Sequence, residues 1–255
     1  MMYTPSGESL HQSIQVKENL YFYLWRGQGN NCNTCVFADV LRGDRPHVIV
    51  DPGLIVDEMQ EHCFDSLVSS MKGDGLSIED IGLIINTHAH PDHCGANQAI
   101  VEDGGGGEKE SSALVTLSKE EDEYRYAIGQ RLYSLLGMQP PEFEPYFYLE
   151  EGELVFGKEK RLTLQVLITP GHSPGSVCLY WPDEKVLITG DVVFLGSVGR
   201  TDFPGGSMSV LMESIEKLSH LDAEWMLAGH STELGGVIDR KEVIERNFQA
   251  IKMMF

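Results

Sequence analysis

The sequence predicts an α+β fold in which two β-sheets pack face to face and helices cover their outer faces. Segments with helical and with strand patterns alternate along the 255 residues, and most of the strand segments are short and apolar. This alternation is typical of layered architectures. Several apolar runs also end in a glycine or a Pro-Gly break that precedes a histidine or an aspartate. The sequence therefore predicts a sandwich of sheets with metal-binding side chain types at its strand ends.

The N-terminal part of the chain reads as strands followed by a helix. The first fifty residues indicate antiparallel strands, with turn signals at 26–31 and 42–44. Residues 57–71 have helical periodicity, because apolar residues recur on one face from Met59 onward. We therefore expect one helix over this range.

The next segment leads into a buried strand and a helix. Residues 77–80 resemble a capping box that opens a short turn, and 82–87 reads as a short apolar strand. Residues 94–101 are predicted as one helix with Pro91 and Asp92 in its first turn. Proline suits that position, and an acidic side chain there meets the positive end of the helix dipole.

The middle of the chain begins with an acidic, glycine-rich segment at 103–110, which we expect to be a flexible loop without chemistry. Residues 113–117 read as a strand, and 119–136 as a helix that ends before Gly137. The proline- and aromatic-rich segment 140–148 fits two interpretations. It could form a lid over a site, or it could pack on the surface.

The C-terminal part is predicted to contain strands over 153–191 and helices over 207–218 and 240–253. No sequence repeat and no linker marks a second domain. We therefore expect a single domain over residues 1–255.

The segment from Thr87 to His93 is the most informative part of the chain. It contains His88, His90, Asp92 and His93 within six positions, directly after the apolar run 82–87. Imidazole and carboxylate groups at this density suit borderline metals such as Zn²⁺. A strand end would hold them rigidly and leave them accessible to water.

Three further apolar runs end in the same way, at His172, Asp191 and His230. A fourth run, 48–50, ends at Asp51. If these strands share one edge of the sheets, the five histidines and two aspartates converge on one place. Two metal ions need about seven protein ligands when a carboxylate and a solvent oxygen bridge them. The sequence therefore predicts a metal site.

The remaining histidines and the cysteines carry less information. His11, His47, His62 and His220 lack a strand-end setting, and we interpret them as ordinary loop or helix residues. Cys32 and Cys35 form a Cys-x-x-Cys pair next to a predicted strand at 34–41, but no second pair accompanies them, so a redox or zinc-ribbon role is disfavoured. Cys94 is interpreted as a small buried residue.

Composition excludes several classes of partner. The formal net charge is −20 at pH 7, which argues against nucleic acid and against anionic membrane surfaces. Five cysteines without framework spacing favour a reducing compartment. The first residues lack a signal peptide pattern, and the apolar run 20–25 is too short to span a bilayer. We expect a cytoplasmic protein with a small-molecule substrate, and the sequence does not indicate its oligomeric state.

The ordered set His-x-His-x-Asp-His, Pro-Gly-His, Gly-Asp and Gly-His resembles the metallo-β-lactamase superfamily, from the Asp51 turn to His230. The resemblance implies a four-layer αββα sandwich, with the metal site at one edge of the two sheets. It also implies the ligand roles. The first metal would be held by His88, His90 and His172, the second by Asp92, His93 and His230, and Asp191 would bridge them.

A closer resemblance is to the glyoxalase II-like hydrolases. It rests on residues 169–177 and 197–206, and on aspartate rather than cysteine at position 191. The sequence departs from that branch after His230, where only twenty-five residues follow. The four basic residues of this C-terminal part are interpreted as surface charges on a helix rather than as glutathione-binding residues; they are Arg240, Lys241, Arg246 and Lys252.

The resemblance predicts a metal-dependent hydrolase of a thioester or similar acyl substrate, acting through a metal-bridging hydroxide. We expect two divalent ions, with zinc as the first choice and iron or manganese as alternatives. Asp92 and Asp191 would be the catalytic carboxylates, with Asp92 also accepting or passing a proton. A thiolate leaves without protonation, which favours thioesters over amides. Arg200 could brace a loop by pairing with Asp202, or it could contact the substrate.

One alternative is a different reaction class. Persulfide dioxygenases resemble this sequence closely around residues 199–202, and they use a single iron held by two histidines and a carboxylate. His90, His172 and Asp191 could form such a triad. The acidic charge disfavours a nuclease of the same fold, the absence of a flavodoxin module disfavours a flavo-diiron enzyme, and the full ligand set disfavours a non-catalytic metal-binding protein.

Overall fold

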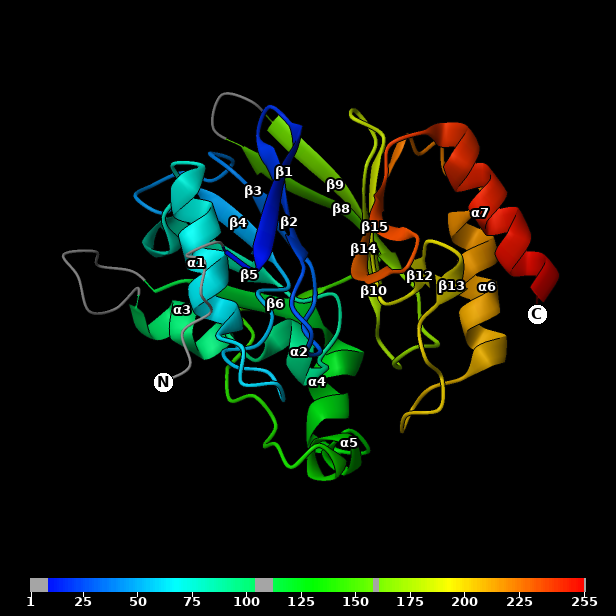
Figure 1. Ribbon diagram of the computed structural model, residues 1–255, viewed down its shortest axis with the longest axis horizontal. Coiled ribbons are helices and arrows are strands. Elements are labelled where there is room, and N and C mark those ends of the chain that lie inside the picture. The colour runs from blue at the N-terminus through cyan, green and yellow to red at the C-terminus, as the bar shows by residue number, and fades with distance from the viewer. Residues whose placement is uncertain (1–8, 104–111, 158–160, 255) are drawn as a thin grey trace.

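The computed structural model describes residues 9–103, 112–157 and 161–254 and contains two large sheets that lie face to face (Figure 1). The strands of the first sheet are β1 (His11–Lys17), β2 (Leu20–Trp25), β3 (Thr34–Phe37), β4 (His47–Val50), β5 (Ile81–Ile85), β6 (Leu114–Ser118) and β7 (Phe147–Leu149), in that spatial order. Strands β1 to β4 pair antiparallel, and β4 to β7 pair parallel. The carboxyl ends of β4, β5 and β6 therefore lie at one edge.

The second sheet has the spatial order β15 (Gly235–Ile238), β14 (Trp225–Thr232), β11 (Val186–Gly190), β10 (Val177–Trp181), β9 (Arg161–Ile168) and β8 (Gly152–Gly157). Its pairs are antiparallel except β11 with β14. Since β9, β11 and β14 run in the same direction, their carboxyl ends also share an edge. A small hairpin, β12 (Val193–Phe194) with β13 (Ser197–Val198), follows β11.

Helices form the two outer layers. They are α1 (Cys63–Gly73), α2 (Pro91–Cys94), α3 (Asn97–Asp103), α4 (Lys119–Tyr126), α5 (Gln130–Leu135), α6 (Met208–Leu218) and α7 (Lys241–Met254), with a 3₁₀ turn, η1, at Ile78–Asp80. Figure 1 shows α1 and α3 outside the first sheet and α6 and α7 outside the second. None of the helices among the described residues has both the length and the apolar character that a bilayer crossing requires.

Inner strands such as β3, β4, β10 and β11 are buried on both faces, which explains their largely apolar sequences, whereas the edge strands β1 and β8 have exposed positions. In β4, Val48 and Val50 point into the core between the sheets, whereas Ile49 packs under the α1 layer. A third cluster joins the second sheet to α6 and α7 through residues such as Leu211 and Phe248. The predicted α+β sandwich of two sheets with outer helices is confirmed.

Three predicted helices differ from the observed ones. The helix expected from residue 57 begins at Cys63, because the Asp57 carboxylate accepts hydrogen bonds from the backbone N–H groups of Met59 and Glu61 and forms a turn. The helix expected over 94–101 is divided into α2 and α3. The N–H group of Ala96 donates to the carbonyl of Gly53 instead of continuing a helix.

The helix expected over 119–136 is also divided, into α4 and α5. The N–H group of Gly129 donates back to the carbonyl of Tyr124, and a Cβ at position 129 would lie 2.6 Å from that oxygen. The chain therefore turns at 127–129. Apart from Asp103, which ends α3, the loop expected at 103–110 lies outside the described residues.

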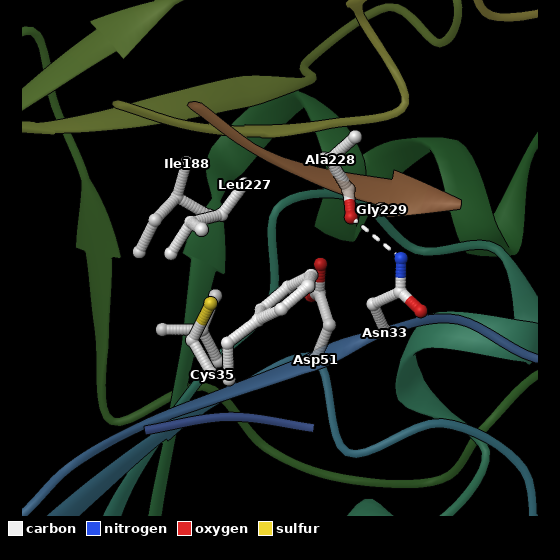
Figure 2. Close-up of a pocket in the computed structure, with 10 residues that line it drawn as sticks. Asn33, Cys35, Asp51, Ile188, Leu227, Ala228 and Gly229 are labelled. Carbon is white, nitrogen blue, oxygen red and sulfur yellow. Dashed lines mark hydrogen bonds between the residues drawn. The ribbon is translucent and has the colours of Figure 1, made fainter. Parts of the chain in front are cut away.

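Asn33 connects the two sheets near the edge where the parallel strands end. Its Nδ2 donates to the carbonyl of Ala228 over 2.9 Å, its Oδ1 accepts from the N–H group of Trp25, and its own N–H group donates to Gly229. Figure 2 shows this link beside a small cavity onto which the Asp51 carboxylate faces. The cavity volume is about 10 Å³, room for about one water molecule.

Replacing this asparagine tests the link between the sheets. Asn33→Ala leaves a buried carbonyl and a buried N–H group without partners, which should lower the free energy of unfolding by roughly 2–5 kcal/mol. Urea denaturation monitored by circular dichroism measures the change. Gln12→Ala, at an exposed position of β1, is the control and should be neutral within about 0.5 kcal/mol. Equal stability of the two variants would show that the link contributes nothing.

Candidate metal centre

Seven side chains from both sheets converge at the shared edge. The loop after β5 and helix α2 supply four of them, and the second sheet supplies three through the β9–β10 turn, the end of β11 and strand β14. The members are His88, His90, Asp92, His93, His172, Asp191 and His230. The strand-end positions predicted from sequence therefore meet at one place, and they do so across two sheets.

The first group of donor atoms is formed by His88, His90 and His172. Nε2 of His172 lies 3.2 Å from Nε2 of His88 and 2.9 Å from Nδ1 of His90. All three rings are buried. Three imidazole nitrogens therefore point at one small volume.

The second group is formed by Asp92, His93 and His230. Nε2 of His93 lies 3.3 Å from Nε2 of His230, which lies 3.1 Å from Oδ2 of Asp92. Asp191 lies between the two groups: its Oδ1 is 3.2 Å from Nε2 of His93, and its Oδ2 is 3.6 Å from Nε2 of His172. One carboxylate thus faces both groups.

These separations fit the geometry of bound metal ions. In a tetrahedral site with bonds of about 2.0–2.1 Å, neighbouring donor atoms lie about 3.3 Å apart. Among the described residues, nothing donates a hydrogen bond to Oδ1 of Asp191, although this atom is buried. A buried carboxylate oxygen without a donor is costly unless a cation faces it. The donor set therefore fits a pair of cations.

Hydrogen bonds on the far side of three rings, those of His88, His93 and His172, orient their donor nitrogens. The Nδ1–H of His93 donates to Asp51 over 2.9 Å, and the Nδ1–H of His172 donates to the carbonyl of Arg200 over 2.7 Å. The hydroxyl of Thr87 donates to Asp51, so its oxygen accepts from Nδ1 of His88. Each of these rings then presents an unprotonated Nε2 to the site, as metal ligation requires.

The electrostatics of the site suit metal binding. Burial lowers the pKa of His88 well below its ordinary value and that of His90 to about 3, so both rings are neutral. Burial alone would raise the pKa values of Asp92 and Asp191, but the surrounding histidines outweigh it and hold both values low. The first donor group therefore holds neutral imidazoles near ionised carboxylates. At His93, burial lowers the pKa, but Asp191 and Asp51 outweigh burial and raise it well above its ordinary value.

His230 behaves differently from His88 and His90. Burial lowers its pKa, but Asp191 and Asp92 outweigh burial and raise it overall. A cation that binds the second donor group has to displace a proton from His230. Its affinity therefore falls as the pH is lowered.

Asp51 organises the donors of the first sheet, although the sequence suggested no role for it beyond its strand-end position. Its carboxylate accepts from the N–H group and the hydroxyl of Thr87 and from His93. Its backbone has a positive φ of 53°, which is unusual for a residue with a Cβ. One side chain therefore fixes the start of the ligand loop and the orientation of its last histidine.

Glu121 was missed by the sequence reasoning. This carboxylate, fully buried at the start of α4, accepts from the N–H group of Ala89 over 2.8 Å, from the hydroxyl of Ser173 over 2.6 Å and from the N–H group of Gly175 over 2.7 Å. Ala89 lies between two ligand positions, and Ser173 follows His172. Glu121 therefore joins the two loops that supply the first donor group.

The four other histidines do not belong to the donor groups, and two of them, His11 and His47, are buried first residues of β1 and β4 instead of the loop or helix residues that were expected. His62 and His220 are exposed and pair with nearby carboxylates, and His11 packs against Trp25. Cys94 is buried, as predicted, and its thiol donates to the carbonyl of His90. The other cysteines are free and buried as well.

A cavity of about 740 Å³ opens over the donor groups. Five of the seven donor residues line it, together with side chains from the loop after β4, from α5 and from the loops after β11; the lining includes Leu54, Val56, Leu132, Leu136, Met138, Phe194, Arg200 and Phe203. Its size is within the range of small-molecule sites.

The segment 140–148 does not line this cavity. Its Pro141 and Phe143 carbonyls accept hydrogen bonds from the guanidinium of Arg125, and the Phe143 ring packs on that group at 4.0 Å. Segment 140–148 therefore packs on the surface and does not form a lid over the donor groups. Helix α5 borders the cavity. The pairing of Arg200 with Asp202, at 2.7 Å, is present, and Arg200 also lines the cavity.

The family model described as the metallo-beta-lactamase superfamily matches residues 34–230, which include every donor residue. The chain belongs to this superfamily. The family and fold expected from the ligand motifs are confirmed.

Two relatives of this chain are named as hydrolases. The hydroxyacylglutathione hydrolase GloC of Haemophilus influenzae is 31% identical over 159 residues, covering 60% of this chain and 70% of its own. The human acyl-coenzyme A thioesterase MBLAC2 is 28% identical over 225 residues, covering 81% of this chain and 75% of its own. Three of the C-terminal basic residues that were expected to be surface charges pair with exposed carboxylates: Arg240 with Asp239, Lys241 with Asp222 and Lys252 with Glu216.

Solved structures of superfamily members share the fold. TTHA1429 from Thermus thermophilus superposes with a TM-score of 0.71 at 21% identity, covering 94% of this chain and 80% of its own. The BLEG-1 B3 metallo-beta-lactamase superposes with a TM-score of 0.58 at 31% identity, covering 79% of this chain and 87% of its own. TTHA1623, solved in a di-iron-bound form, superposes with a TM-score of 0.61 at 28% identity, covering 87% of this chain and 98% of its own.

The role of Glu121 can be tested by an isosteric change. Glu121→Gln replaces one acceptor oxygen with an N–H₂ group that faces at least one of the three donors, so we expect a loss of roughly 1–3 kcal/mol in unfolding free energy and a lower bound-metal content. Thermal unfolding and elemental analysis measure both effects. Glu120→Gln, at the exposed neighbouring position, is the matched control. Wild-type metal content and stability in the Glu121 variant would refute the assigned role.

Proposed function

We propose that this protein is a metal-dependent hydrolase of thioesters that uses two divalent ions, most simply zinc. The observation that carries the proposal is the pair of donor groups that share Asp191 at the floor of a cavity of about 740 Å³. We further propose that the whole chain, 1–255, forms one such domain and acts on a small-molecule substrate in the cytoplasm, a reducing compartment that fits five free cysteines.

Under this proposal each donor group would hold one ion. His88, His90 and His172 would hold the first and Asp92, His93 and His230 the second, with Asp191 facing both groups. When bound, two such cations would lower the pKa of water and polarise a carbonyl group.

Asp92 is the proposed proton acceptor. It lines the cavity, its pKa is held low by the neighbouring histidines despite burial, and Nδ2 of Asn30 donates to its Oδ2 over 2.8 Å. This hydrogen bond fixes the carboxylate while leaving Oδ1 for a proton. Asp92 would thus combine ligation with proton transfer.

The other titratable groups of the cavity bear on the choice of leaving group. Outside the donor residues they are Asp57, Glu58 and Arg200. Both carboxylates accept hydrogen bonds from backbone N–H groups, and Arg200 pairs with Asp202. Burial raises the pKa of Asp57, and its Oδ2 has no hydrogen-bond partner among the described residues, so this carboxyl is the candidate acid of the lining. A thiolate leaves unprotonated and does not need it. Relatives named as an acyl-coenzyme A thioesterase and a hydroxyacylglutathione hydrolase support the same choice.

The alternative from the sequence, a single-iron persulfide dioxygenase, uses only part of this donor set. A triad such as His90, His172 and Asp191 leaves the second group without a function, although its atoms converge at 3.1–3.3 Å. Two ions per chain and thioester hydrolysis support the proposed function. One iron per chain with oxygen consumption on glutathione persulfide would favour the dioxygenase.

Removal of metal provides a direct test. Chelation should abolish thioester hydrolysis and lower the melting temperature by roughly 5–10 °C, because ions bound at about a hundred times their dissociation constant stabilise by about 2.7 kcal/mol. Zinc addition should restore both, measured by scanning calorimetry and by a thiol-release assay. An unchanged melting temperature and full turnover after complete metal removal would contradict the proposal.

Asp191 tests the sharing of one carboxylate by two ions. Asp191→Ala should lower turnover by roughly 10³-fold, because several kcal/mol of charge stabilisation depend on the paired ions, and it should reduce the metal content from two ions to one or fewer. Thiol release and elemental analysis measure these effects. Asp239→Ala, a change at an exposed carboxylate, is the control. Full turnover with two bound ions in the Asp191 variant would rule out the shared carboxylate.

A further inference from the structure

The cavity has an apolar wall that the proposed chemistry does not use. Leu132, Leu136 and Met138 of this wall come from α5 and the turn after it, and Leu54 comes from the loop after β4. Leu54 and Met138 pack in one apolar cluster, so the two segments form a continuous surface. We call these four residues the α5 wall.

The α5 wall is partly uncovered. Leu132 is buried, but the Leu136 side chain is 52% exposed although it lines the cavity. Exposed apolar surface next to a reaction site gains free energy when an apolar ligand covers it. The wall is therefore suited to contact a hydrocarbon part of the substrate.

The α5 wall has no side chain that can form a hydrogen bond to a hydroxyl group, since its members are leucines and a methionine. A hydroxyl placed against it would lose its bonds to water without replacement. The surface therefore discriminates against a hydroxyacyl group and in favour of a plain alkyl chain.

The charges of the cavity lining outside the donor groups disfavour an anionic group at the far end of the acyl chain. Asp57 and Glu58 line the cavity, and Arg200, its one lysine or arginine, gives two hydrogen bonds to Asp202, of 2.9 and 2.7 Å. The guanidinium also stacks on Phe203 at 4.1 Å. A carboxylate at the end of the acyl chain would thus lie near Asp57 and Glu58. Arg200, which could pair with it, is already paired with Asp202.

We infer that the substrate carries an uncharged, apolar acyl chain of several carbons, and that the α5 wall is the surface that binds it. The inference rests on the proposed thioester hydrolysis and specifies its substrate class. Under it, Leu136 is a specificity-determining residue that contacts the chain beyond the reacting carbonyl. A lactoyl-type acyl group is a poor substrate.

The test uses the metal-loaded protein and S-acyl-N-acetylcysteamine thioesters, because their neutral thiol removes any contribution from an anionic leaving group. Acetyl, butanoyl, hexanoyl and octanoyl esters are compared with the lactoyl ester. We expect kcat/KM to rise up to about fourfold per added methylene, the transfer value for a fully buried CH₂ group, and the lactoyl ester to fall below the butanoyl ester. A flat series, or a preference for lactoyl, would overturn the inference.

Two neighbouring leucines provide a matched pair of variants. Leu136→Asn should lower kcat/KM for the octanoyl ester by roughly five- to tenfold while leaving the acetyl ester unchanged, since about one to two methylenes lose their contact. Leu135→Asn changes the same residue type one position earlier, where the side chain is 77% exposed and does not line the cavity. It should retain the wild-type series. Identical behaviour of the two variants would refute a role for Leu136.

A binding experiment separates this inference from the proposed function. The uncleavable thioether S-octyl-N-acetylcysteamine should bind wild type and Leu135→Asn equally in titration calorimetry, and Leu136→Asn roughly fivefold more weakly, in line with the loss of contact for about one methylene. Failure to cleave any thioester would contradict the proposed function, and binding that depends on chain length and on Leu136 would still support the α5 wall. Binding that is equal in all three proteins would overturn the wall assignment.

Discussion

The hydrogen bonds accepted by the buried carboxylate of Asp51 are the contacts on which the donor cluster most depends. They connect the end of β4 to the loop after β5 through Thr87 and hold the ring of His93 by its Nδ1. A metal ligand is useful only when its lone pair has one fixed direction. Asp51 has a positive φ, which is unfavourable for a residue with a Cβ. The hydrogen bonds that its carboxylate accepts at this position offset that cost.

Glu121 has the same function on the opposite side of the site. It accepts from the loop between His88 and His90 and from the turn that carries His172, and these segments belong to different sheets. Asp51 and Glu121, both buried, thus hold the ligand loops from the side opposite the donor atoms.

The sequence predicted the seven donors because each one follows a short apolar run, and parallel strands place such positions at a common edge. The prediction needed no knowledge of the loops. Glu121 could not be predicted in this way, since its partners lie 32, 52 and 54 residues away and meet it only after the sheets have packed. The family match confirms the fold, while the ligand assignments stay predictions that metal analysis can test.

The helix predicted over 119–136 shows a second limit of sequence patterns. Its composition allows one continuous helix, but the bond from Gly129 back to Tyr124 turns the chain and brings α5 to the cavity. Propensity describes each segment in isolation, whereas this turn depends on a close backbone approach. The residues that we propose to determine specificity lie in α5 and the turn after it. The sequence predicted that this segment is helical, but it did not predict where the segment lies in the fold.

The division of the donor residues between two sheets has a consequence for biogenesis. Neither the segment up to residue 103 nor the segment from 161 onward contains a complete donor group, because the first group needs His172 and the second needs His230 beside residues of the first sheet. If the protein binds two ions as proposed, a nascent chain emerging from the ribosome could not hold both until β14 has joined the sandwich. Metallation would then come last, and it would act as a cross-link that selects chains whose two sheets have already docked in the correct register.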